Sequence, residues 1–148
     1  MDLQQRIRQD MRQAMRSGDA LQRDLLRLLR SEIGYAEIAA QNELDDAMVV
    51  DVVSREIRKR RDALVLYRQG KRDDLVAKAD KEIAHLERYL PPQLSEDEIR
   101  SQIQRIIDEL ASRGQADLGS VMRTAMPRMK GQVDGKVVNQ IVRELLSQ

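Results

Sequence analysis

The segment YLPPQLSEDE, residues 89–98, decides how the chain is organised. Its two consecutive prolines end any helix that reaches them, because proline lacks an amide hydrogen and forces the preceding residue out of the helical region. Ser95 and Glu98 have the spacing of a capping box, in which a hydroxyl and a carboxylate satisfy the first amides of a new helix. The segment therefore predicts one domain over residues 1–90 and a second over residues 91–148.

Four amphipathic helices are predicted before this boundary. Apolar residues recur at every third or fourth position over 3–15, 20–40, 46–69 and 73–90, which is the period of one buried helix face. Gly18 suits a left-handed helix end, and Asp19 suits the cap of the next helix. Gly70 is expected to end the third helix as Gly18 ends the first. Short connections between such helices favour a four-helix bundle.

Three shorter helices are predicted after the boundary. The first begins at Ser95 and ends at Gly114. Asp117 is placed to cap the second, which Pro127 must bend or end. Asp134 follows the turn KGQV, residues 130–133, and is placed to cap the third. The predicted fold class is therefore all-α, with a helical bundle of about four helices and a small C-terminal lobe of three.

The composition restricts the chemistry that the chain can perform. It contains no Cys, which excludes disulfides and thiolate metal sites. Its one histidine, His85, is interpreted as a surface residue in the middle of a helix, so neither a Ser-His-acid triad nor a zinc site is expected. No phosphate-binding loop or dinucleotide-binding motif occurs. We therefore expect no catalytic residues, no metal and no cofactor.

The sequence gives no indication of a membrane segment. No stretch approaches the roughly 20 apolar residues that a membrane span needs, and the N-terminus, MDLQQRIRQD, lacks the apolar core of a secretion signal. We therefore expect a cytoplasmic protein without a membrane partner.

A basic stretch runs through the third predicted helix, from Arg55 to Arg72. A solvated helix face is its simplest explanation, and binding to nucleic-acid phosphate is the alternative. Arg60 falls inside the apolar stripe of this helix, where a cation must be paired or reach water. Glu56, one turn earlier, and Glu32, in the second helix, are its candidate partners. We hypothesise a structural ion pair that locks the first bundle.

A second basic region surrounds the turn before the last helix. Residues 112–148 carry six basic and three acidic side chains, a net charge of +3. Arg128, Lys130 and Lys136 flank the turn, and lysines beside the exposed amides of a helix N-terminus make a phosphate site. A DNA-reading helix-turn-helix is disfavoured, because the last helix is mostly apolar and offers few side chains to base edges. We therefore expect no DNA partner.

Four segments resemble a known family. They are KRRD at 59–62, YLPPQLSE at 89–96, DLGSVM at 117–122 and MPRMKGQVDGKVVN at 126–139. On these segments the chain resembles the GatB/YqeY family, and most closely its stand-alone YqeY-like members, over nearly its whole length. Two positions depart from the family pattern: Pro92 stands where Glu is frequent, and Gln132 where Lys is common.

The resemblance implies a function in tRNA metabolism. A similar domain forms the C-terminal tail of the B subunit of the tRNA-dependent amidotransferase, where it contacts tRNA while the catalytic and ATP-binding parts lie elsewhere. The chain is thus expected to be a tRNA-binding accessory module that is not itself catalytic. By this likeness its candidate contact residues are Arg123, Arg128, Lys130, Gly131, Gly135, Lys136 and Asn139. For the two glycines and the asparagine, a role in the geometry of the turn is the alternative.

Two further functions stay open. One is a protein-interaction module that docks on a tRNA-handling enzyme, such as an amidotransferase subunit or an aminoacyl-tRNA synthetase. The other is a free-standing enzyme, which is the least supported because no acid–base pair, nucleophile or metal cluster can be assembled. A family-level description as a carbon–nitrogen ligase with glutamine as amido-N-donor would then be inherited from the larger enzyme.

Overall fold

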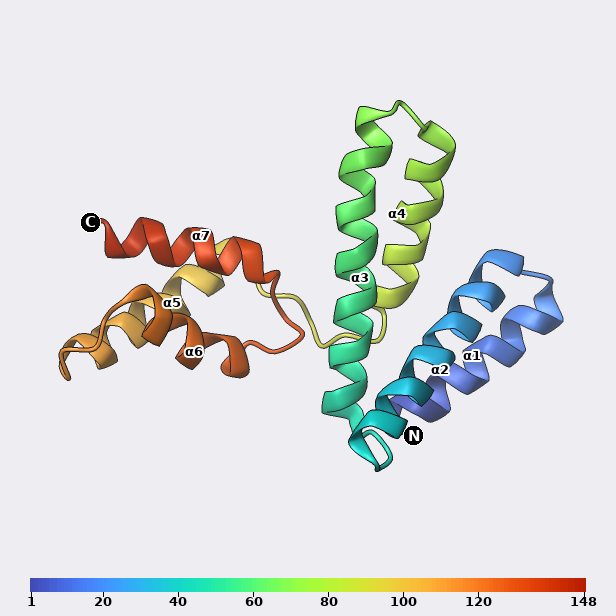
Figure 1. Cartoon of the computed structure of the whole chain (residues 1–148), viewed down its shortest axis with the longest axis horizontal. Helices are drawn as coiled ribbons and strands as arrows, with labels where there is room; N and C mark the ends of the chain where they lie inside the picture. The colour runs from blue at the N-terminus through green and yellow to red at the C-terminus, as the bar shows by residue number, and fades with distance from the viewer. The chain divides into compact units, whose positions relative to one another are not determined.

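The computed structural model describes all residues from 1 to 148 and contains seven helices and no strand (Figure 1). The predicted all-α class is therefore confirmed. The chain separates into two compact units, Met1–Leu90 and Pro91–Gln148. None of the seven helices is long and apolar enough to cross a membrane.

The N-terminal unit consists of two antiparallel helical hairpins. Helices α1 (Leu3–Ser17) and α2 (Ala20–Ala40) form the first hairpin, and α3 (Asp46–Gln69) and α4 (Asp73–Glu87) form the second (Figure 1). Helix α2 also packs on α3 and α4, and α1 packs on α3. Each helix contributes to one aliphatic core, whose members include Ile7, Leu26, Val53 and Leu86.

The C-terminal unit is a three-helix cluster. It comprises α5 (Glu96–Ala111), α6 (Leu118–Arg128) and α7 (Gly135–Leu146), and each helix packs on the other two. Ile103, Val121 and Val138 supply one fully buried side chain from each helix. Removing such aliphatic surface from water is the main force that holds so small a unit together.

Local sequence signals set most helix ends. Gly18 has φ +75° and ends α1, and the Asp19 carboxylate accepts a hydrogen bond from the Gln22 amide at 3.0 Å. The capping box of Ser95 and Glu98 is complete at the start of α5. Asp45, Asp117 and Asp134 cap α3, α6 and α7 with their carboxylates. Because a cap joins neighbouring residues, these ends could be predicted without tertiary information.

Two helix ends differ from the prediction. Gly70 has φ −82°, and the left-handed residue after α3 is Lys71, with φ +55°. Helix α4 ends at Glu87 instead of reaching Leu90, because the last three amides before the prolines bond to carbonyls three residues earlier. This tighter winding turns Tyr89 into the core, where its side chain is 3% exposed.

Tyr89 joins the end of the fourth helix to the first. Its hydroxyl donates a hydrogen bond to Asp10 Oδ2 at 2.6 Å, and the Arg6 guanidinium lies 5.3 Å from the centre of its ring. Arg6 also donates to the carbonyl of Arg88 at 3.2 Å. Burial of the ring, and then the hydrogen bond to Asp10, raise the pKa of the Tyr89 hydroxyl well above its usual value. The neutral phenol is therefore the form that the folded protein stabilises.

We expect Tyr89→Phe to lower the free energy of unfolding at pH 7 by about 1 to 2 kcal/mol, because it removes a hydrogen bond to a charged carboxylate. Because the pKa of Tyr89 is raised in the folded state, its contribution to the free energy of unfolding is complete below about pH 10, the pKa of tyrosine in the unfolded chain. The contribution is lost as the pH rises above that value. Urea unfolding between pH 7 and 11 should show the native and Tyr89→Phe curves converging. Tyr35→Phe, at a ring that is 67% exposed, is the control and should change nothing; a gap that stays constant above pH 10 would contradict the assignment.

Candidate nucleic-acid interface

The turn between α6 and α7 holds its basic side chains on a buried anchor. Met129 ends α6 with a side chain that is 0% exposed, whereas Arg128 and Lys130, on either side of it, are exposed. Gly131 follows with φ +76°, a conformation that costs an L-residue about 1 to 2 kcal/mol. Val133 then packs against the core of the C-terminal unit. The chain thus alternates between buried and exposed positions through the turn.

The segment after the two prolines straps this turn in place. The Leu94 amide donates to the Gln132 carbonyl at 2.9 Å, and the Gln93 side-chain amide donates to the Gly131 carbonyl at 2.7 Å. In return the Gln132 side chain donates to the Pro92 carbonyl at 3.2 Å. These bonds fix the backbone that carries Arg128, Lys130 and Lys136. We call these three residues and the turn between them the basic turn. Sequence reasoning missed this role, and its only signal was the unusual glutamine at position 132.

The charged residues predicted for this site have different surroundings. Arg128 lies 3.4 Å from a carboxylate oxygen of Glu109, in a pair whose side chains are both about half exposed. Arg123 donates to Ser120 Oγ at 3.2 Å, so its guanidinium lies toward the start of α6 and away from the basic turn. Hydrogen bonds from Ser120, and then the charge of Arg123, lower the pKa of Asp117. Lys130 and Lys136 are exposed.

The start of α7 is partly occupied by its own cap. Gly135 is the first residue of the helix, and Asp134 Oδ1 accepts a hydrogen bond from the Lys136 amide at 2.9 Å. One of the first amides of α7 is thus satisfied by the cap that the sequence predicted at Asp134. Asn139 lies one turn into α7 and accepts from Arg143 Nε at 2.8 Å, so its side chain supports the helix.

A family model described as Yqey-like protein matches residues 4–146. The chain belongs to the YqeY-like family. The resemblance seen in the sequence is thereby confirmed over nearly the whole chain.

The relatives of this YqeY-like chain include proteins of two names. Altered inheritance of mitochondria protein 41, mitochondrial, from Kluyveromyces lactis is 32% identical over 107 residues, which cover 70% of this chain and 58% of that protein. The protein of the same name from Pyrenophora tritici-repentis is 26% identical over 144 residues, covering 95% of this chain and 79% of the relative. The E subunit of glutamyl-tRNA(Gln) amidotransferase from Methanospirillum hungatei is 48% identical over 61 residues, which cover 38% of this chain but 10% of the relative. The 61 matched residues thus correspond to a small part of that much longer protein.

Arg60 of the YqeY-like chain lies at the centre of an ion-pair network between α3 and α4. Its Nε donates to Glu82 at 3.0 Å, and another guanidinium nitrogen donates to both the carboxylate and the carbonyl of Glu56, at 3.2 and 3.0 Å. Glu56 is buried, with 4% exposure. Arg60 therefore pairs with Glu56 as hypothesised, but Glu82 takes the second position that the sequence offered to Glu32, which forms no salt bridge. Glu82 was missed because its proximity depends on the register of two helices.

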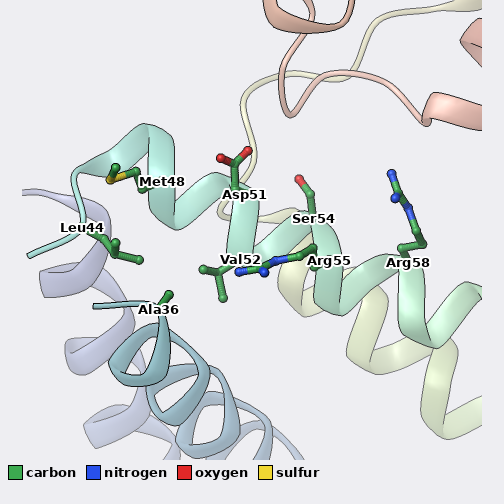
Figure 2. Close-up of a pocket in the computed structure, with 8 residues that line it drawn as sticks. All are labelled: Ala36, Leu44, Met48, Asp51, Val52, Ser54, Arg55 and Arg58. Atoms are coloured by element: carbon green, nitrogen blue, oxygen red, sulfur yellow. The ribbon is translucent and has the colours of Figure 1, made fainter. Parts of the chain in front are cut away.

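The remainder of the basic stretch divides into paired and unpaired cations. Lys59, Arg60, Arg61, Arg68 and Arg72 each form a salt bridge with a carboxylate of the N-terminal unit. Arg55, Arg58 and Lys71 form none, and the two arginines border a hollow of about 440 Å³ between α2 and α3. Figure 2 shows Arg55 reaching back toward Val52 while Arg58 extends away from the helix. Ala36, Leu44 and Val52 give this hollow an apolar floor.

His85 is more enclosed than the sequence indicated. The residue is half-buried on α4 instead of fully exposed, and its Nδ1 atom is buried without a hydrogen-bond partner. No group of three or more His, Asp or Glu side chains is arranged to hold a metal ion.

We expect Arg60→Met to lower the free energy of unfolding by about 2 to 4 kcal/mol, because it removes the cation shared by Glu56 and Glu82 in a largely buried place and leaves only Lys59 beside Glu56. The matched control is Arg68→Met, on the same helix, whose pair with Asp80 spans 4.0 Å between side chains that are more than half exposed. That control should cost less than about 1 kcal/mol. Urea unfolding measures both variants. An Arg60→Met variant as stable as the native chain would rule out a required pairing role.

Proposed function

We propose that this YqeY-like protein is a non-catalytic accessory module that binds tRNA through the basic turn and acts beside a tRNA-dependent amidotransferase. The main observation behind this proposal is that hydrogen bonds with residues 92–94 hold the turn, so that Arg128, Lys130 and Lys136 extend from a fixed backbone. The similarity to a subunit of glutamyl-tRNA(Gln) amidotransferase supports this function, because the name of that enzyme gives an aminoacylated tRNA as its substrate.

A fixed array of cations suits tRNA because its backbone is a chain of phosphates. Lys and Arg that contact phosphates release bound counterions, so the affinity falls as the salt concentration rises. The Gly131 turn and the hydrogen bonds from Gln93 and Leu94 hold the array in place before binding. Less conformational entropy is then lost when the complex forms.

We expect the double variant Lys130→Ala, Lys136→Ala to bind unfractionated tRNA more weakly than the native chain at low salt. The slope of log affinity against log salt should fall by up to about 2, or roughly one unit for each phosphate contact. Filter binding or fluorescence anisotropy at low and near-physiological salt measures the slope.

The matched control for that experiment is Lys78→Ala, Lys81→Ala. It removes the same charge from exposed positions on α4, which form no salt bridge, and should leave the slope unchanged. Equal affinities of the native chain and of the basic-turn variant at both salt concentrations would eliminate the basic turn as the tRNA contact.

The hollow between α2 and α3 favours docking on a protein as a second candidate function. Its apolar floor and the 43% exposed Met48 suit an aliphatic side chain of the partner, and the unpaired Arg55 and Arg58 suit neighbouring carboxylates. We expect the tagged native chain to recover amidotransferase subunits from nuclease-treated extract, and Met48→Glu to lose them. Met15→Glu, at an exposed methionine of α1, is the control. Loss of the subunits after nuclease alone would contradict direct docking.

A further inference from the structure

One face of the α1–α2 hairpin carries a groove lined by arginines. A hollow of about 240 Å³ has Arg8 of α1 and Arg30 of α2 among its lining residues. An adjoining hollow of about 330 Å³ is bordered by Met11, Arg27 and again Arg30. Arg30 borders both hollows, and we call the two together the arginine groove. Neither of the two basic regions identified in the sequence includes it.

The cations of the arginine groove form no salt bridge within the protein. Arg8, Arg27 and Arg30 all lack a carboxylate partner at salt-bridge distance, and the hydrogen bond of Arg30 is a weak one to the sulfur of Met11 at 3.9 Å. The carboxylate that lines the groove, Glu37, is already engaged: it accepts from the Gln4 side chain at 3.2 Å and from the Leu44 amide at 3.0 Å. The groove therefore presents three positive charges to a ligand.

The residue type favours a phosphate ligand. Every basic residue before Lys59 is an arginine. A guanidinium is planar, donates two parallel hydrogen bonds to one phosphate and stacks on flat rings, whereas an ammonium acts as a point charge. An array made of guanidinium groups alone therefore suits the phosphates and bases of a nucleic acid. A requirement for positive charge alone could be met equally well by lysines.

The shape of the groove also favours nucleic acid over a protein partner. Ile7 and Ile33, which line the first hollow, belong to the core and are almost fully buried, so they offer no apolar anchor. Gly34 leaves the floor open, because a Cβ atom placed there would meet nothing within 4 Å. Protein interfaces depend on a few large buried anchors, whereas a phosphate backbone needs cations on the walls of a channel.

We propose that the arginine groove binds the sugar-phosphate backbone of RNA, with Arg8 on one wall and Arg27 and Arg30 on the other. This inference rests on the proposed function and adds to it an RNA contact on the N-terminal unit. It assigns the α1–α2 hairpin a binding role that is separate from the residues of the basic turn.

The test compares tRNA binding by the full-length native chain and by the triple variant Arg8→Gln, Arg27→Gln, Arg30→Gln across a salt series. We expect the slope of log affinity against log salt to fall by about 2 to 3, since each lost phosphate contact removes about 0.7 to 0.9. The matched control, Lys71→Gln, Lys78→Gln, Lys81→Gln, removes the same charge from exposed positions that form no salt bridge and should retain the native slope. Gly34→Glu places one carboxylate on the open floor and should weaken binding while keeping the helical circular dichroism.

The outcomes separate this inference from the proposed function. If the basic-turn variant loses affinity while the triple arginine variant binds as the native chain does, the arginine groove is not an RNA site and the proposed function stands. If the native chain fails to bind tRNA at low salt, both are wrong. If the native chain binds poly-glutamate more tightly than tRNA at equal charge concentration, and the triple variant loses poly-glutamate but keeps tRNA, the groove takes acidic protein segments and the RNA assignment is overturned.

Discussion

The buried carboxylate of Glu56 is the constraint around which the N-terminal unit is organised. It is the buried charged residue of the chain, and a charge taken out of water must be paired. Arg60 pairs with it and extends to Glu82, so the same guanidinium fixes α3 against α4. Aliphatic stripes without large aromatic rings allow helices to slide in register. We infer that directional contacts of this kind, together with Tyr89 and Asp10, specify one arrangement.

The features that could be predicted from the sequence are those set by neighbouring residues. Apolar periodicity gave the helices, and the caps at Asp19, Ser95 and Asp117 gave their starts, because both depend on spacings of a few residues. The features that could not be predicted depend on distant contacts. Helix register decides that Glu82 and not Glu32 reaches Arg60, and the tighter winding after α4 places Tyr89 where it meets Asp10 of α1.

The two surfaces proposed to bind RNA show the same division between local and distant contacts. Arg128, Lys130 and Lys136 are close in sequence, so the basic turn could be recognised as a cluster, although its support by Gln93 could not. The arginine groove joins Arg8 to Arg30 across two helices, and their individual spacing looks like ordinary solvated faces. Only the packing of α1 on α2 brings these arginines around the same two hollows.

A net charge of +1 is compatible with both surfaces. At physiological ionic strength the screening length is about 8 Å, so a bound phosphate senses the cations beside it and little of the remaining chain. What matters locally is how the nearby carboxylates are used. Asp134 accepts from the amide of Lys136, and Glu37 accepts from Gln4 and Leu44. In both places the carboxylate accepts hydrogen bonds from the protein itself. These bonds fix the backbone from which the neighbouring basic side chains extend. A nearly neutral chain can in this way bind a polyanion locally without the long-range attraction that a strongly basic protein exerts on every nucleic acid.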